Sequence, residues 1–179
     1  QIPLSPHKYE EHLINIYIII FSFLICPYIL YGNSFGYIHE FSGEVIIETN
    51  DEKGLVLTAI KGRSIYDGYI VKAKEDSYCD IYSSDKRTFI RIDSNSNVKF
   101  TENRETREIY LEDGSMYISN RNPDIAKQTF VFSDFSQIYL TNSNFWLSSK
   151  ESSYDQIYSF GKQIDISDRY KGIRYNGNN

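Results

Sequence analysis

The chain has 179 residues, of which 41% are hydrophobic and 24% are charged. This balance allows a buried core and excludes a disordered tail. The net charge is −5, which argues against a nucleic-acid binder because such proteins need a basic surface. Aromatic residues make up 16% of the chain, with 16 Tyr and 11 Phe against one Trp. That excess favours β-strands over helices.

The N-terminal segment is strongly hydrophobic. No charged residue occurs from Leu13 to Ile38, and the apolar stretch 13–31 has about the length of 18 or more residues that spans a membrane as a helix. Residues 1–36 are therefore predicted to form one hydrophobic helix, either a signal peptide cleaved after Ser34 or a membrane anchor. A buried core helix is the third interpretation. We expect an exported protein that is periplasmic, on the cell surface or anchored in the inner membrane.

After residue 40 the hydrophobic pattern has a period of two, which is typical of β-strands. In one such stretch Ile90 and Ile92 alternate with Phe89 and Arg91. The predicted strands are 42–49, 54–60, 77–82, 88–93, 107–111, 115–119, 128–133, 136–141, 144–149, 154–160 and 163–167. Asp113-Gly114 predicts a hairpin turn between two of them. The pattern predicts an all-β domain over residues 37–169, a sandwich or short β-solenoid of about 12 short strands, followed by a flexible tail at 170–179.

The residues that carry most enzyme chemistry are sparse. The three histidines all precede residue 40, so a His-dependent nucleophile cannot be assembled within the main body. Cys26 and Cys79 lie in different contexts, so we expect neither a disulfide between them nor a zinc site. Acidic pairs such as Glu112-Asp113 fall in predicted turns, and the mixed charges of 99–107 predict a solvated hairpin. We expect a non-enzymatic protein with no catalytic, cofactor or metal residues.

The tyrosines are the candidate partner-binding residues. In their strands they alternate with aliphatic side chains, and a tyrosine suits a half-exposed binding surface because it has an apolar body and a polar tip. The candidates are Tyr82, Tyr110, Tyr117 and Tyr139. Cross-strand pairing that stabilises a solvated sheet would give the same pattern. The functional interpretation is a sheet face that binds a protein partner or a glycan.

The order of short motifs resembles the FecR-type domain of bacterial envelope proteins over residues 42–168. The resemblance rests on a Gly-Xaa-Val strand, Gly-led turns, a Leu-Xaa-Xaa-Gly turn and a last Gly before a strand. These motifs are Gly43-Glu44-Val45, Gly62-Arg63-Ser64-Ile65, Asp67-Gly68-Tyr69-Ile70, Leu111-Glu112-Asp113-Gly114-Ser115 and Gly161-Lys162-Gln163-Ile164. Further matches are the strand pair 77–83 and 89–98. Asn142-Ser143 replaces the Gly-Thr pair of the family, in the stretch that continues to Asn144-Phe145-Trp146-Leu147.

The resemblance implies envelope signalling or regulation through protein–protein contacts. Regulators of that family carry a cytoplasmic sigma-factor-binding region before a membrane helix, and only about 12 residues precede the hydrophobic run here. We therefore expect the sigma-regulating role not to transfer, unless sequence upstream of residue 1 has been lost. The alternative is a structural or adhesive surface module that binds glycan or a partner through a Tyr-rich face. If the stretch 13–31 is not cleaved, it would also contact the membrane.

Overall fold

The computed structural model describes residues 34–50, 54–121, 127–149, 154–160, 164–168 and 174–176. All of them belong to one unit, Asn33–Asn179. The described residues form fifteen β-strands and no helix, so the all-β prediction is confirmed. None of these residues belongs to a helix long and apolar enough to cross a membrane. The predicted hydrophobic helix 13–31 lies outside the described residues.

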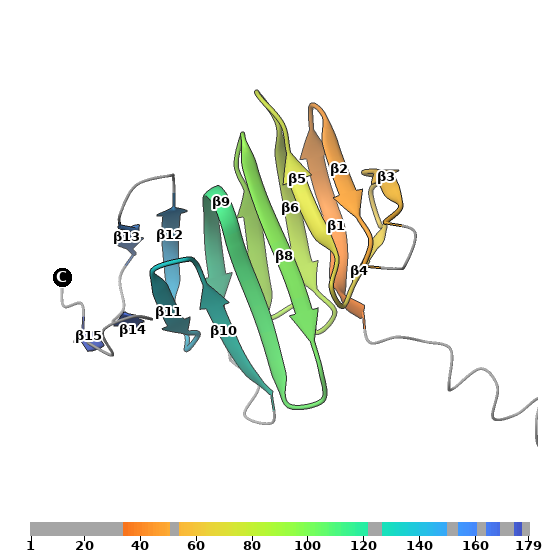
Figure 1. Ribbon diagram of the computed structural model, residues 1–179. Coiled ribbons are helices and arrows are strands. Elements are labelled where there is room, and N and C mark those ends of the chain that lie inside the picture. The colour runs from red at the N-terminus through yellow and green to blue at the C-terminus, as the bar shows by residue number, and fades with distance from the viewer. Residues whose placement is uncertain are drawn as a thin grey trace, which may run out of the picture. The chain divides into compact units, whose positions relative to one another are not determined.

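The strands form one continuous sheet that curls into two facing layers (Figure 1). Layer A contains, in spatial order, β4 (Ser64–Tyr66), β1 (Ser34–Ser42), β6 (Tyr78–Ser83), β7 (Thr88–Ile92), the second half of β9 (Thr106–Asn120), β12 (Asn144–Ser149) and β13 (Gln156–Ser159). Layer B contains β3 (Val56–Thr58), β2 (Val45–Glu48), β5 (Ile70–Ala73), β8 (Ser96–Glu102), the first half of β9, β10 (Gln128–Phe132), β11 (Ser136–Tyr139), β14 (Asp165–Asp168) and β15 (Arg174–Asn176).

Strand β9 joins the two layers. Its first half pairs with β8 and β10, and its second half pairs with β7 and β12. The change occurs at Asp113-Gly114, where Gly114 has a φ of +93° and the register with β8 shifts. The predicted hairpin at this dipeptide is wrong, because 107–111 and 115–119 do not pair with each other. Glycine permits the left-handed backbone that lets the strand cross between layers.

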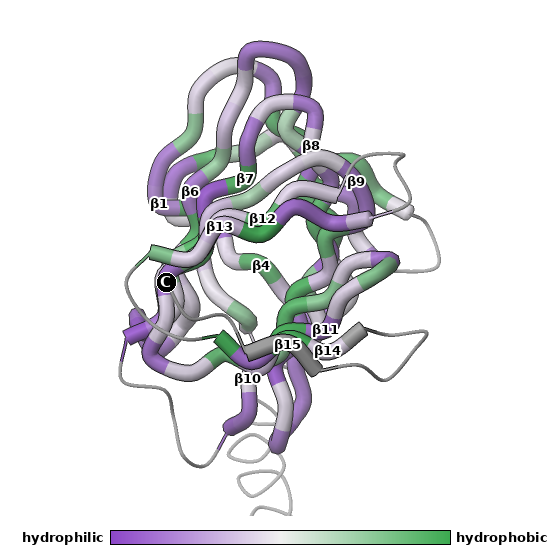
Figure 2. The backbone as a smooth tube through the Cα atoms, turned by 90° about the vertical axis from the view of Figure 1, so that its left-hand side faces the viewer, coloured by the Kyte–Doolittle hydropathy of each residue, from purple (hydrophilic) through white to green (hydrophobic). Residues whose placement is uncertain are grey.

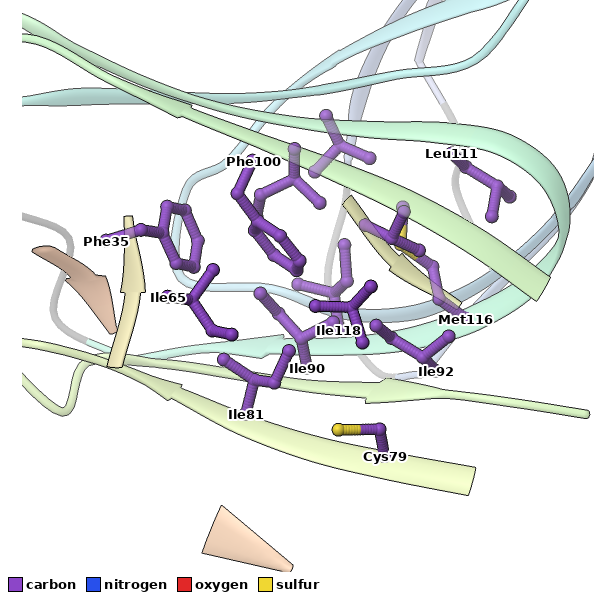
Figure 3. Close-up of a cluster of buried hydrophobic side chains, with 14 of the residues drawn as sticks. Phe35, Ile65, Cys79, Ile81, Ile90, Ile92, Phe100, Leu111, Met116 and Ile118 are labelled. Carbon is purple, nitrogen blue, oxygen red and sulfur yellow. The ribbon is translucent and has the colours of Figure 1, made fainter. Parts of the chain in front are cut away.

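The core lies between the two layers. Alternate residues of each strand point inward, so hydrophobic and hydrophilic positions alternate along much of the backbone (Figure 2). Ile81, Ile90 and Ile118 of layer A and Phe100 of layer B are fully buried and converge in the interior (Figure 3). Phe35 of layer A contacts Phe100 across the interior, with ring centroids 4.5 Å apart. Burying such side chains stabilises the fold by about 1.5–3 kcal/mol each.

Several strands differ from the predicted ones. β1 begins at Ser34, so Phe35, which the sequence pattern placed in the N-terminal segment, is a fully buried core residue. β4, β5 and β8 were not predicted, and residues 170–179, predicted as a flexible tail, contain β15. The stretch 99–107 is a β8–β9 hairpin, but it is not solvated on its inner side. Glu102 and Arg107 pair across it and are 8% and 4% exposed.

Candidate binding surface

The four predicted tyrosines do not form one surface. Tyr82 of β6 and Tyr117 of β9 lie on the outer face of layer A. Tyr110 lies in the half of β9 that belongs to layer B, and Tyr139 is in β11 of the same layer. The single Tyr-rich face is therefore corrected to two faces, one on each layer. The bend in β9 causes the division, since Tyr110 and Tyr117 flank it.

The outer face of layer A carries an aromatic strip that crosses most of its strands. Neighbouring rings are 5.2–6.3 Å apart between centroids, within the range of favourable aromatic contacts. Each ring comes from an outward position of a neighbouring strand, or from the residue that follows β13. The strip consists of Tyr37, Tyr82, Phe89, Tyr117, Trp146, Tyr158 and Phe160. Of these rings, only Tyr82 and Tyr117 were predicted as binding residues.

Two adjoining hollows lie along this strip and share Tyr117. We call them together the trough. The apolar end has a volume of about 440 Å³ and is lined by Tyr117, Trp146, Tyr158 and Phe160. Tyr158 and Phe160 are 54% and 56% exposed. Trp146 is held in place because its indole Nε1–H donates a hydrogen bond to Asp93 Oδ2 at 3.0 Å.

The other end of the trough is cationic. It has a volume of about 380 Å³, with Tyr82, Phe89, Tyr117 and Ser119 in its lining. Among the described residues, three positively charged ones complete the lining and none is acidic. They are Lys86, Arg87 and Arg121. The Arg121 N–H donates to the Arg87 carbonyl oxygen at 2.9 Å, so the backbone holds two of these cations beside each other.

The β6–β7 turn separates opposite charges. Asp85 points away from the trough, where its carboxylate accepts hydrogen bonds from Ser83 Oγ at 2.5 Å and from the Arg87 N–H at 3.1 Å. Partial burial raises the pKa of Asp85, but these hydrogen bonds and the charge of Arg107 outweigh it and hold the pKa below its usual value. Asp85 is thus engaged elsewhere, and the neighbouring Lys86 lines the trough.

Asp85 contacts a charge cluster whose buried members, Glu102 and Arg107, belong to the β8–β9 hairpin. Arg107 Nε lies 2.9 Å from Glu102 Oε2, and Arg107 Nη1 lies 3.2 Å from Asp85 Oδ2. Lys127 Nζ lies 2.5 Å from Glu102 Oε1. The Arg107 guanidinium also lies 5.2 Å from the Phe35 ring centroid. Each buried charge has an opposite partner, which is the condition for burying it. The cluster therefore has a structural explanation.

The outer face of layer B carries a second, smaller aromatic group. The Tyr110 and Phe132 rings stack at 5.5 Å, and Phe130 lies 5.4 Å from Tyr139. A hollow of about 290 Å³ beside Tyr139 is lined by polar residues of β10, β11 and β14 and by Phe130 and Ile166. Tyr139 is 38% exposed, less than Tyr158 and Phe160 of the trough. No cation lines this hollow among the described residues.

Within the described part of the chain, the chemistry of Cys79 is suppressed. The thiol is buried between the layers, and this burial, together with the neighbouring Asp80 charge, raises its pKa to about 12. A thiol with such a pKa is a poor nucleophile. The residues that the structure describes also contain no group of three or more His, Cys, Asp or Glu side chains that could hold a metal ion.

No known protein family and no curated protein matches this chain. Two crystal structures of a candidate anti-sigma factor from Parabacteroides distasonis are similar to it, with 11% sequence identity and a TM-score of 0.44. The similarity covers 61% of this chain and 59% of each of those chains. A likeness at this identity and score assigns no function to the chain.

Proposed function

We propose that this chain is a non-enzymatic envelope protein whose β domain acts through protein–protein contacts in signalling or regulation. The signalling role rests on the resemblance of residues 42–168 to the FecR-type domain. The mode of action rests on one observation, which is the exposed trough on the outer face of layer A. The proposed binding site is thus this trough rather than all four tyrosines.

The composition of the trough supports a protein partner. Tyr, Trp and Arg are the residues most enriched among those that dominate protein–protein binding energies. All three occur in the trough, together with two Phe rings. Isolated exposed apolar residues are ordinary on a protein surface, whereas a contiguous group of them is typical of a binding site. Four aromatic side chains line the apolar end alone.

The layer beneath the trough would present it rigidly. Trp146 lies directly opposite Tyr117 on one side and Tyr158 on the other in paired strands. Fully buried Met116, Ile118 and Leu147 fix the inward side of β9 and β12. Rings held by a packed sheet lose little freedom on binding, which favours affinity.

Site-specific photocrosslinking tests this function in the full chain. A photoreactive phenylalanine analogue is placed at Tyr158 in the trough, and the matched control carries it at Tyr139 on layer B. We expect the analogue at Tyr158 to trap one defined envelope protein in cells. We expect the analogue at Tyr139 not to trap it.

The crosslinked protein must then bind the purified chain directly. Replacing Tyr158 and Phe160 by Ser is expected to weaken that binding by roughly tenfold or more. The control replaces two other exposed apolar residues, Val56 and Ile60, by Ser. Equal trapping from both layers, or binding that survives the Tyr158 and Phe160 replacements, would contradict the proposed function. Trapping of glycan alone would favour the adhesive alternative.

A further inference from the structure

We infer that the hollow on the outer face of layer B, beside Tyr139, binds an uncharged sugar ring of a glycan. One face of the sugar lies against two aromatic rings, and its hydroxyls meet the polar side chains around them. This inference is independent of the proposed function, because the hollow and the trough lie on different layers. It concerns a second site with a different class of ligand.

Two aromatic rings of paired strands line the hollow. Phe130 of β10 lies directly opposite Tyr139 of β11, and their ring centroids are 5.4 Å apart with 47° between the ring planes. Phe130 also stacks on Phe132 at 6.1 Å, so packing holds the first ring in place. Tyr139 is 38% exposed, so part of its ring is open to a ligand. The C–H face of a sugar can lie on such a ring, because the ring face is negative and the sugar hydrogens are weakly positive.

Polar side chains flank this pair of rings on both sides. Gln128 lies on one side, two residues before the first ring and therefore on the same face of β10. On the other side Gln137 of β11 lies opposite Ser167 of β14, and both line the hollow. Asp165 lies opposite Tyr139 and ends the aromatic row. The strand register thus surrounds an apolar surface with amide, hydroxyl and carboxylate groups.

A sugar ring needs this combination of groups. Each of its hydroxyls both donates and accepts hydrogen bonds, and burying one without a partner is unfavourable. A Gln amide offers two donors and an acceptor oxygen with two lone pairs, and an Asp carboxylate offers two acceptor oxygens. The Ser167 hydroxyl donates to the Gln137 carbonyl oxygen at 3.3 Å, and its own oxygen can still accept. These groups therefore have capacity for a ligand even where they also bind another partner.

The size of the hollow suits a small ligand unit. Its volume is about 290 Å³, close to the lower limit of about 300 Å³ that is typical of small-molecule pockets. The lining residues come from three neighbouring strands, β10, β11 and β14. A single sugar unit, at the end of a glycan or within it, matches this extent.

The same lining disfavours other classes of ligand. The Asp165 carboxylate repels the phosphates of a nucleic acid and the carboxylate of an acidic sugar, and the net charge of −5 acts in the same direction. Asp and Ser are depleted in protein–protein interfaces, yet Asp165 and Ser167 both line this hollow. An uncharged sugar meets neither conflict.

Saturation-transfer NMR on the full chain tests for the ligand. The probes are short oligosaccharides of glucose, galactose, mannose and N-acetylglucosamine, with oligogalacturonate as the acidic counterpart. We expect at least one of the neutral oligosaccharides to bind with saturation, and its ring C–H protons to receive the strongest transfer because they lie against aromatic side chains. Oligogalacturonate is expected not to bind. Absence of saturable binding for every neutral probe, or equally tight binding of oligogalacturonate, would overturn the inference.

Substitutions in the hollow locate the bound sugar. Tyr139→Ala removes the exposed ring and is expected to weaken binding by roughly tenfold, whereas Tyr139→Phe keeps the ring and should stay within about threefold. Gln128→Ala with Gln137→Ala removes both amides and is expected to cost roughly fivefold or more. This double variant keeps both rings, so it tests the site even if Tyr139→Ala does not fold. Unchanged affinity in a folded Tyr139→Ala chain or in the double variant would overturn the inference.

The same substitution on the other layer separates this inference from the proposed function. Tyr158→Ala removes a ring from the trough and should weaken binding of the crosslinked protein while leaving the sugar affinity within about twofold, and Tyr139→Ala should do the reverse. A sugar affinity that falls with Tyr158→Ala but not with Tyr139→Ala would place the sugar elsewhere, and the inference would fail. If the sugar binds as expected but no protein is trapped at Tyr158, the inference stands and the proposed function fails.

Discussion

The β6–β7 turn lies between two groups of charged side chains that differ in their burial and in their partners. On one side Arg107 is 4% exposed and is surrounded by Glu102, Asp85 and the Phe35 ring. On the other side Lys86 and Arg121 are exposed and line the trough. The same kind of side chain is thus a structural element in the first group and a candidate recognition element in the second. Burial and partners decide the role, so substitutions should separate stability from binding.

The largest expected effect comes from breaking the buried cluster. Arg107→Ala removes the main partner of the buried Glu102 carboxylate, and we expect a loss of roughly 3–5 kcal/mol in the free energy of unfolding. Denaturant unfolding of the chain measures it. If the variant does not fold, Arg107→Lys keeps the charge but loses the two-partner geometry and should show a smaller loss. A loss below about 1 kcal/mol for Arg107→Ala would mean that the cluster contributes little.

The contrast between buried and exposed positions extends to two glycines. At Gly114 a Cβ would lie 2.5 Å from the Asn95 carbonyl oxygen and overlap Ser96, whereas at Gly62 it would meet no atom within 4 Å. Both have a positive φ, +93° and +83°. We expect Gly114→Ala to lose about 2–3 kcal/mol and Gly62→Ala about 1 kcal/mol, since only the first combines strain with overlap. Thermal unfolding of the two variants measures the difference, and equal losses would contradict the close approach at the bend.

Asp85 connects the two charge groups. Its carboxylate should make the free energy of unfolding depend on pH in the acid range. Its pKa is lowered in the folded chain, so its contribution is complete above the pKa of an unfolded Asp, about 3.9. That contribution is lost as the pH falls through the lower folded pKa. We expect Asp85→Asn to lose about 1 kcal/mol at neutral pH and to show a shallower decline below pH 4. Unfolding measured over the acid range checks this, with Glu112→Gln at the exposed bend as the control. An unchanged acid slope would refute it.

The smallest expected effect on stability comes from the trough. Lys86→Ala and Arg121→Ala are each expected to change the free energy of unfolding by less than about 0.5 kcal/mol, because exposed side chains away from special features rarely do more. The same denaturant series measures them beside Arg107→Ala. A large loss in either would show that the trough cations are structural, and the contrast between the two charge groups would disappear.

Part of the fold could be predicted from local pattern. The alternation in β6, β7, β10 and β12 follows directly from their inward and outward positions. β1 was missed because Ser34 to Ile38 continues the uncharged N-terminal run, so its buried Phe35 resembles the end of a hydrophobic helix. β8 was missed because Ser96 and Asn97 resemble a turn. Both errors arise where tertiary burial overrides a local signal.

The site was harder to predict than the fold. Alternation shows that Tyr110 and Tyr117 point away from the core, but it cannot show that a bend places them on different layers. Likewise, Glu102 and Arg107 are local neighbours, but Asp85 and Lys127 join them only through the fold. The cations of the trough come from a turn and a strand end that are distant in sequence. Aromatic residues at positions opposite the aliphatic face, such as Phe89, were the available signal for the strip, and cross-strand pairing on a solvated sheet explains that signal equally well.

The pairing of strand β9 with both layers determines how the domain unfolds. Its 15 residues supply pairing partners to four other strands, two in each layer. Neither layer keeps its central pairing without it, so partial opening of one layer would expose the other. We expect the β9 amide hydrogens to exchange only on global unfolding. A single proteolytic cut at the exposed Glu112-Asp113 bend should therefore abolish the cooperative transition instead of releasing two folded halves.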